Sequence, residues 1–270
     1  MKSIFSIFFF LIIGYNSFSQ IKVSVYNEKT DTGYTVLVDN SEFCPVSVFL
    51  KLELTNLTSG NGNDKIFVIP AQTKKFPITT LQIIQPNAPY GFKTKTRSNY
   101  GDSTLTDYTD YNYSLPFQTG KSFAVYQGYN GSFSHQNENS LDFTMPVGTP
   151  VVAARDGIVI KVVANNNLNC AEKKCAEYNN YVLLYHNDGT FSKYIHLKMN
   201  GVVVKEGAIV KENDLLGYSG NTGWSNGPHL HFMVYQQRID KVETIKTKFK
   251  TDDGTAAQQL TEKVMYLKNY

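Results

Sequence analysis

The sequence predicts an all-β protein made of two domains. Three features indicate this class: abundant aromatic residues (18 Tyr and 17 Phe), short apolar runs that alternate with polar residues, and turn-forming Gly, Asn and Asp between the runs. A chain of 270 residues suits one large or two modest domains. The formal net charge of +3 is mild and no basic stripe is interleaved with aromatics, so we expect no nucleic-acid partner.

Residues 1–19 have the pattern of a secretory signal peptide. Lys2 precedes an apolar run at residues 4–13, and small and polar residues lead to a Ser-x-Ser cleavage site after Ser19. The alternative is a membrane anchor, but the run is too short to span a bilayer core of about 30 Å. We therefore expect an exported protein that begins at Gln20 and has no membrane span. Without a lipobox Cys at the cleavage site, a periplasmic or secreted protein is expected.

Residues 20–96 predict an accessory domain that resembles a β-sandwich. The alternating runs fall at residues 22–26, 35–38, 46–54, 65–69 and 80–84, with Gly, Asn, Asp and Pro in the gaps. This region contains no histidine, and nothing catalytic stands out in it. Residues 97–120 form either a linker or a packed segment, and their many aromatic residues favour packing.

Residues 121–240 predict a second β domain with longer apolar runs. The clearest strands fall at residues 150–154, 157–163, 181–185 and 202–205, and no convincing amphipathic helix interrupts them. Residues 241–270 form a C-terminal extension, in which we expect one strand at residues 243–250 and one short helix at residues 256–268.

Cys170 and Cys175 lie in a polar segment, residues 165–180, that is typical of a long loop between strands. In an exported protein this pair is expected to form a disulfide. The alternative is a metal site, but no second Cys pair or nearby His completes one. Cys44 has apolar neighbours, and we expect it to be a buried free thiol.

The His-x-His sequence that ends the segment 219–232 is the most informative feature of the chain. Side chains alternate between the two faces of a strand, so His229 and His231 point the same way, opposite to the apolar layer. Two imidazoles on one face can share a metal ion, or one can bind the ion while the other works beside it. All five histidines fall between residues 135 and 231.

Asp142 lies between Leu141 and Phe143, which places the apolar neighbours in a core and the carboxylate on the opposite face. A carboxylate there needs a partner charge or a metal ion. Asp142, His135 and one histidine of the His-x-His pair make a His₂Asp set. Such a set leaves the fourth position of a tetrahedral Zn²⁺ open, as in catalytic sites. Nitrogen and oxygen ligands without thiolate fit Zn²⁺, and the spacing leaves other divalent ions open.

Two further histidines lie in predicted strands or turns. Tyr194 and His196 alternate onto one face of a predicted strand, and His196 is as compatible with an ordinary hydrogen-bonded residue as with a functional one. His186 precedes an Asn-Asp-Gly turn, and we interpret it as a structural residue or an outer partner of the site.

These motifs, taken in order, resemble those of the lysostaphin-type zinc endopeptidases, the M23 or LytM family. The matching pieces are His135 with Asp142-Phe143, the segment 146–157 (PVGTPVVAARDG), the segment 194–197 (YIHL), and the segment 217–223 (GYSGNTG) leading into 227–232 (GPHLHF). The resemblance covers roughly residues 120–237, and its last block is highly specific. Many relatives place the Asp four positions after the first His. The interval of seven here is similar to that of a Gram-negative subgroup, and we interpret it as a loop insertion.

The resemblance implies an antiparallel β fold with a metal site in a groove. It implies one Zn²⁺ per chain, held by His135, Asp142 and His231, and assigns His229 and His196 as catalytic histidines that do not bind the ion. Family members cut peptide bonds in the stems or cross-bridges of bacterial peptidoglycan, so peptidoglycan peptides are the implied substrate.

The implied mechanism is hydrolysis by a zinc-activated water with histidine general acid–base assistance. The chain has no His-Glu-x-x-His motif, so the base is not a glutamate of that kind. His229 is the best candidate, and His196 either orients the water or stabilises the oxyanion. We expect Tyr194 and Trp224 to contact the substrate, with a role as core filler as the alternative for Trp224.

Three other functions are compatible with parts of the sequence. The first is a non-catalytic protein of the same fold that binds or activates other cell-wall hydrolases, but such relatives usually lack ligand residues that are all present here. The second is a secreted adhesive β protein that happens to bind a metal ion. The third is an enzyme of the same kind that cuts an exported Gly-rich protein.

Overall fold

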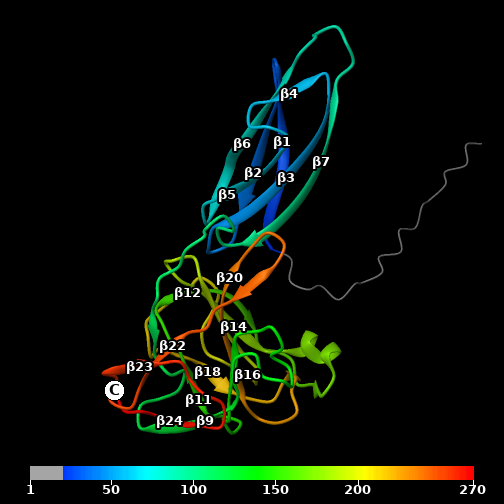
Figure 1. Cartoon of the computed structure of the whole chain (residues 1–270). Helices are drawn as coiled ribbons and strands as arrows, with labels where there is room; N and C mark the ends of the chain where they lie inside the picture. Colours follow the sequence, from blue (N-terminus) through cyan, green and yellow to red (C-terminus); the bar gives the residue numbers. More distant parts are fainter. Residues whose placement is uncertain (1–20) are drawn as a thin grey trace, which may run out of the picture.

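The structure, a computed structural model, describes residues 21–270 (Figure 1). Nearly all of its regular structure consists of strands, and the described residues contain a single short 3-10 helix, η1 (Lys173–Tyr178). The predicted all-β class is therefore confirmed. The signal peptide predicted at residues 1–19 lies outside the described residues. Within residues 21–270, no helix has the length and the apolar character that crossing a membrane requires.

The N-terminal part consists of two antiparallel sheets that enclose one apolar core. One sheet has the order β1 (Val23–Thr30), β2 (Gly33–Asn40), β6 (Thr73–Ile83), β4 (Leu57–Ser59), and the other β5 (Asp64–Ile69), β3 (Val46–Thr55), β7 (Gly91–Tyr100). Side chains from both sheets fill the space between them, among them Val36, Val38, Val48, Leu50 and Leu81. This part projects as an elongated unit from the rest of the molecule (Figure 1).

Strand β7 extends this unit beyond residue 96. It pairs with β3 along its whole length, from Gly91 opposite Thr55 to Tyr100 opposite Val46. Residues 97–100 therefore belong to the sheet, although their polar composition is typical of a linker. Pairing with the long apolar strand β3 outweighs this local composition.

The second part is organised around a large antiparallel sheet. Its order is β17 (Ile209–Val210), β12 (Gly157–Val163), β14 (Tyr181–Tyr185), β15 (Phe191–Ile195), β20 (Leu230–Gln237), β10 (Ser140–Phe143), β9 (Lys121–Gln127), β24 (Met265–Lys268), with β21 (Val242–Thr244) paired to β20. One face covers a core that includes the fully or nearly fully buried rings of Phe143, Tyr194 and Phe232.

Three small sheets complete this part. They are β11 (Pro150–Val152), β18 (Leu215–Ser219), β16 (Leu197–Val202); then β13 (Asn169–Cys170) with β19 (Gly223–Trp224); and β23 (Ala256–Gln258), β22 (Lys248–Thr251), β8 (Asn112–Tyr113). The strand predicted at residues 202–205 is wrong, because β16 ends at Val202 and Val203 is 55% exposed.

Residues 101–120 pack against this core. Tyr113, Leu115 and Phe117 are buried in it, and β8 pairs in parallel with β22. The burial of these aromatic and apolar side chains explains the unusual composition of the segment.

The C-terminal residues form strands, and the helix predicted at residues 256–268 is wrong. Strand β24 pairs with β9, which buries Tyr266 and Lys268 and exposes Met265 and Leu267. The buried Lys268 Nζ donates a hydrogen bond to Leu115 O at 2.8 Å. Pairing with the edge of the large sheet overrides the local helical pattern. The single strand predicted at residues 243–250 is divided into β21 and β22.

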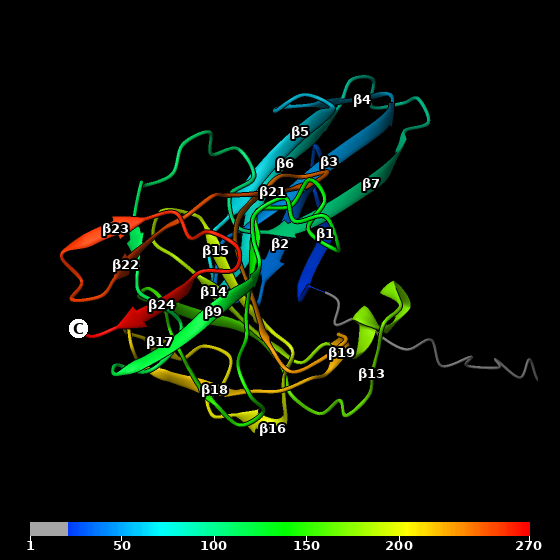
Figure 2. The same ribbon diagram turned by 60° about the horizontal axis from the view of Figure 1, so that its bottom comes forward.

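The N-terminal sheets lie beside the large sheet (Figure 2). The two parts meet there through an apolar cluster. Cys44, which is buried and free as expected, packs there with Phe191 and Tyr235. Asn99 in β7 donates hydrogen bonds to the carbonyl groups of Arg238 and Ile239 at 2.9 and 2.7 Å. The N-terminal unit is therefore in direct contact with β15 and β20, which also position the candidate site.

Candidate active site

Neighbouring strands bring Asp142 and His231 together. In the antiparallel register Asp142 of β10 lies opposite His231 of β20, and His231 lies opposite Ile195 of β15. Residues directly opposite each other in a sheet point to the same face. Leu141 and Phe143 are fully buried in the core on the other face. Asp142 and His231 therefore face the groove, as the alternation of side chains predicts.

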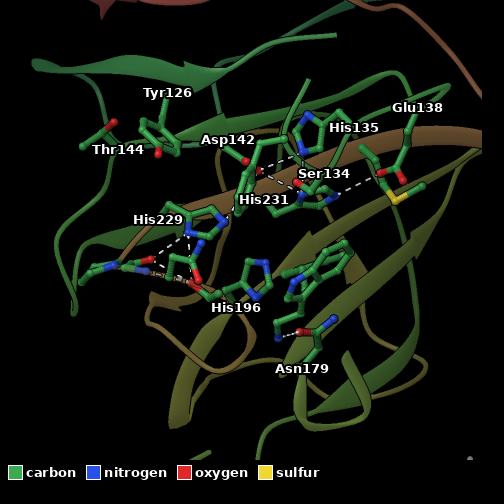
Figure 3. Close-up of a pocket in the computed structure, with 18 residues that line it drawn as sticks. Tyr126, Ser134, His135, Glu138, Asp142, Thr144, Asn179, His196, His229 and His231 are labelled. Carbon is green, nitrogen blue, oxygen red and sulfur yellow. Dashed lines mark hydrogen bonds and ion pairs between the residues drawn. The ribbon is translucent and has the colours of Figure 1, made fainter. Parts of the chain in front are cut away.

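The ligand atoms of His135, Asp142 and His231 converge, so that these three residues could hold a metal ion (Figure 3). His135 Nε2 lies 3.3 Å from Asp142 Oδ1 and 3.2 Å from His231 Nδ1, and His231 Nδ1 lies 2.9 Å from Asp142 Oδ1. Ligand atoms about 2.0–2.2 Å from a tetrahedral ion are about 3.3–3.6 Å apart. The triangle is close to that size, so the residues present fit Zn²⁺.

The second ring nitrogen of each histidine in this triangle also has a partner. His135 Nδ1 donates a hydrogen bond to Gly128 O at 3.0 Å, and His231 Nε2 lies 3.4 Å from Glu138 Oε1. Burial raises the pKa of Glu138, but its bonds with His231 and Ser140 lower that pKa to about 2. Such partners fix the orientation of metal-binding imidazoles. Both rings are therefore held with one nitrogen directed at the common point.

His229 and His196 lie beside the triangle as neutral imidazoles. Each donates its Nδ1–H to a backbone carbonyl, His229 to Gly227 at 2.8 Å and His196 to Thr222 at 2.7 Å. Burial lowers the pKa of both, and the neighbouring histidines help to bring that of His196 to about 3. The rings are 4.5 Å apart, and His229 Nε2 is 3.7 Å from Asp142 Oδ1. Each ring can therefore accept a proton or a hydrogen bond at Nε2.

Tyr194 does not share a face with His196, contrary to the sequence-based expectation. Its ring is fully buried against Phe232, and its hydroxyl accepts the Ala154 N–H at 2.8 Å. His196 follows the end of β15 with a backbone φ of 66°, in the left-handed region. This turn breaks the alternation, so that Ile195 and His196 line the groove while Tyr194 belongs to the core. The expected contact of Tyr194 with substrate is not supported.

The groove around the histidines has aromatic walls. Tyr126 and Phe133 line it with exposed fractions of 66% and 64%, and Trp224 lines it while half-buried. Trp224 Nε1–H donates to Ala171 O at 3.0 Å, within the loop that the disulfide between Cys170 and Cys175 closes. The predicted disulfide is thus present, and it stiffens the loop that holds Trp224 in the groove wall.

Four residues of the site and its surroundings are not predicted from the sequence. Tyr126 and Phe133 carry no motif, although alternation along β9 would place Tyr126 opposite to the buried Val125. Glu138 lies between His135 and Asp142, and its acidic side chain is the only sequence feature that could have indicated a role in the site. Gln127 of β9 contacts Asp142 of the neighbouring strand β10, and nothing in the sequence indicates such a contact.

His186 lies outside the groove and is completely buried. Its Nδ1 donates to Asp156 O at 2.7 Å, and its Nε2 accepts the Ser192 hydroxyl at 2.9 Å. Burial lowers its pKa to about 4. A structural role is consistent with these contacts.

We expect protonation of the buried His186 to lower the free energy of unfolding as the pH falls. The folded state disfavours protonation of His186. The contribution of this residue to the free energy of unfolding is therefore complete above its unfolded pKa of about 6.5, and it is lost between about pH 6.5 and pH 4. Between neutral pH and about pH 5 the unfolding free energy should fall by about 2 kcal/mol more in the unmodified chain than in His186→Gln. Urea unfolding at both pH values measures this, and equal losses in the two proteins would rule out the role.

Comparison with known proteins finds similarity in the part of the chain that contains most of this site. Residues 136–243 match the family described as Peptidase family M23. The chain is 25% identical over 233 residues to an uncharacterized metalloprotease of Buchnera aphidicola subsp. Baizongia pistaciae, covering 85% of this chain and 53% of that protein. It is 38% identical over 94 residues to the peptidoglycan DD-endopeptidase ShyA of Vibrio cholerae serotype O1, covering 35% of this chain and 19% of that protein. The chain thus spans about half of the first relative and about a fifth of the second.

Among solved structures, the catalytic domain of the antimicrobial peptidase lysostaphin from Staphylococcus simulans is similar. It is 29% identical in sequence, over 52% of this chain and 87% of that chain, with a TM-score of 0.33.

Proposed function

We propose that this chain, a member of peptidase family M23, is an exported zinc-dependent endopeptidase that cuts peptide bonds in the stems or cross-links of bacterial peptidoglycan. One observation carries the proposal: three convergent ligand atoms lie beside two neutral imidazoles in an open groove. The substrate class comes from a relative named as a peptidoglycan endopeptidase. We assign the activity to residues 121–240 and an accessory role to residues 20–96.

The histidines that bind no metal would move and hold protons. A zinc ion held by His135, Asp142 and His231 would supply activation of a water molecule and polarisation of the scissile carbonyl. His229 takes the proton of the attacking water at Nε2, and returns it to the amine nitrogen when the C–N bond breaks. Its Nδ1–H remains bonded to Gly227 O and keeps the ring oriented.

His196 is better suited to orient the water than to stabilise the oxyanion. Its only ring proton in the neutral form is donated to Thr222 O, so Nε2 can accept a hydrogen bond but cannot donate one. The hydroxyl of Tyr126, in the same groove, is a donor that can serve the oxyanion. His229, His196 and Tyr126 thus have separate proposed roles: proton transfer, orientation of the water and stabilisation of the oxyanion.

Digestion of purified peptidoglycan sacculi tests the proposed function. We expect the mature protein to release fragments whose masses show cleavage of peptide bonds and intact glycan linkages. Binding to sacculi without release would favour the alternative of a non-catalytic binding protein or activator. Release of peptides from a Gly-rich exported protein but not from sacculi would indicate an endopeptidase with a different substrate.

A further inference from the structure

The side chain of Gln127 lies at the centre of a hydrogen-bonding network beside the metal-ligand triangle. Gln127 is the last residue of β9, is 5% exposed, and pairs with Asp142 of β10. Its Nε2 donates to Asp142 Oδ2 at 3.0 Å and to Ser134 Oγ at 2.8 Å. Its Oε1 accepts the N–H groups of Phe133 and Ser134 at 3.1 and 3.0 Å. Both hydrogens and both lone pairs of the amide are therefore used.

These bonds act on two of the three ligands at once. Because Gln127 holds Oδ2 of Asp142, Oδ1 is the oxygen that faces His135 and His231. His135 follows Ser134, which Gln127 binds through both its backbone and its hydroxyl. One side chain thus determines which carboxylate oxygen faces the site and where the loop presents the first imidazole.

Gln127 ties together the two ends of the seven-residue connection between the ligands, because it bonds to both Ser134 and Asp142. The segment from His135 to Asp142 includes a left-handed turn residue, Asn137, with φ of 60°. A longer connection has more conformations to lose when its ends are brought to a fixed separation. Three hydrogen bonds from a single buried amide restrict the loop directly ahead of His135.

We propose that Gln127 is a positioning residue that pre-organises Asp142 and His135 for the metal ion. This inference rests on the metal site of the proposed function and adds a requirement that the ligand set does not contain. It concerns the geometry of the ligand set, so its consequence is the affinity for zinc and not only the rate of hydrolysis. Outer partners of metal ligands typically contribute about 10–100-fold in metal affinity.

Gln127→Met tests the proposal, because methionine has a similar length and keeps the apolar contacts without the hydrogen bonds. Competition with a chromophoric chelator measures the zinc affinity of the full mature chain. We expect Gln127→Met to bind zinc about 10–100-fold more weakly than the unmodified protein. Gln236→Met is the matched control: Gln236 is also buried, at 4% exposed, but its Nε2 donates to Asp107 O, away from the groove. This control should leave zinc affinity unchanged.

Gly131→Ala provides a second variant if Gln127→Met does not fold. A Cβ at Gly131 would lie 2.4 Å from Gln127 Cγ, so the substitution displaces the side chain while the amide itself remains. We expect a smaller loss of zinc affinity in the same direction. If the unmodified chain binds zinc and a folded variant of either kind binds it equally well, the proposed role of Gln127 is overturned and the proposed function stands. Absence of zinc binding by the unmodified chain would overturn the proposed function with it.

Discussion

Replacing His231 with alanine is expected to remove bound zinc and to abolish hydrolysis. His231 Nδ1 lies within 3.2 Å of both Asp142 Oδ1 and His135 Nε2, so its loss leaves two ligand atoms where the site needs three. The zinc affinity should fall by more than about 100-fold, beyond the loss typical of an outer partner. Metal analysis after dialysis measures the content, and sacculus digestion measures the activity.

His186→Gln is the control for this experiment, because it also removes a buried imidazole but lies outside the groove. It should retain one zinc per chain. Stoichiometric zinc in His231→Ala would show that the ion binds elsewhere in the chain.

Replacing His229 with alanine is expected to separate metal binding from turnover. His229 lies beside the triangle, with its Nε2 3.7 Å from Asp142 Oδ1, and it is not one of the three convergent residues. The variant should keep its zinc and lose about 10²–10⁴-fold in kcat, the contribution typical of a general acid–base group. KM should change little.

Added imidazole gives this second prediction a further test. If His229 acts through proton transfer, free imidazole in the emptied position should restore part of the rate in His229→Ala and none in His231→Ala. Full activity of His229→Ala without imidazole would exclude the proposed role.

The parts of the site that lie on regular strands could be predicted from the sequence. Alternation alone places Asp142 between two core residues and turns His231 to the opposite face, and the register confirms that the two lie opposite each other. The same reasoning fails for Tyr194, because the left-handed backbone of His196 interrupts the strand. A period of two applies only where the backbone is extended.

Contacts between distant segments could not be predicted. Gln127 and Glu138 act through bonds to Asp142 and His231, and these bonds depend on strand pairing and on the course of a loop. The local pattern predicts a C-terminal helix, whereas residues 265–268 form β24 because the edge of β9 is available to pair with them. Tertiary pairing decides such segments.

We propose above all that hydrolysis depends on one zinc ion in this groove. The most direct test is to remove metal with a chelator, add zinc in measured portions, and follow peptide release from sacculi. This dependence predicts that peptide release is absent without zinc and rises until about one equivalent per chain is bound. Equal release with and without the ion would contradict it, as would zinc-dependent release by His231→Ala.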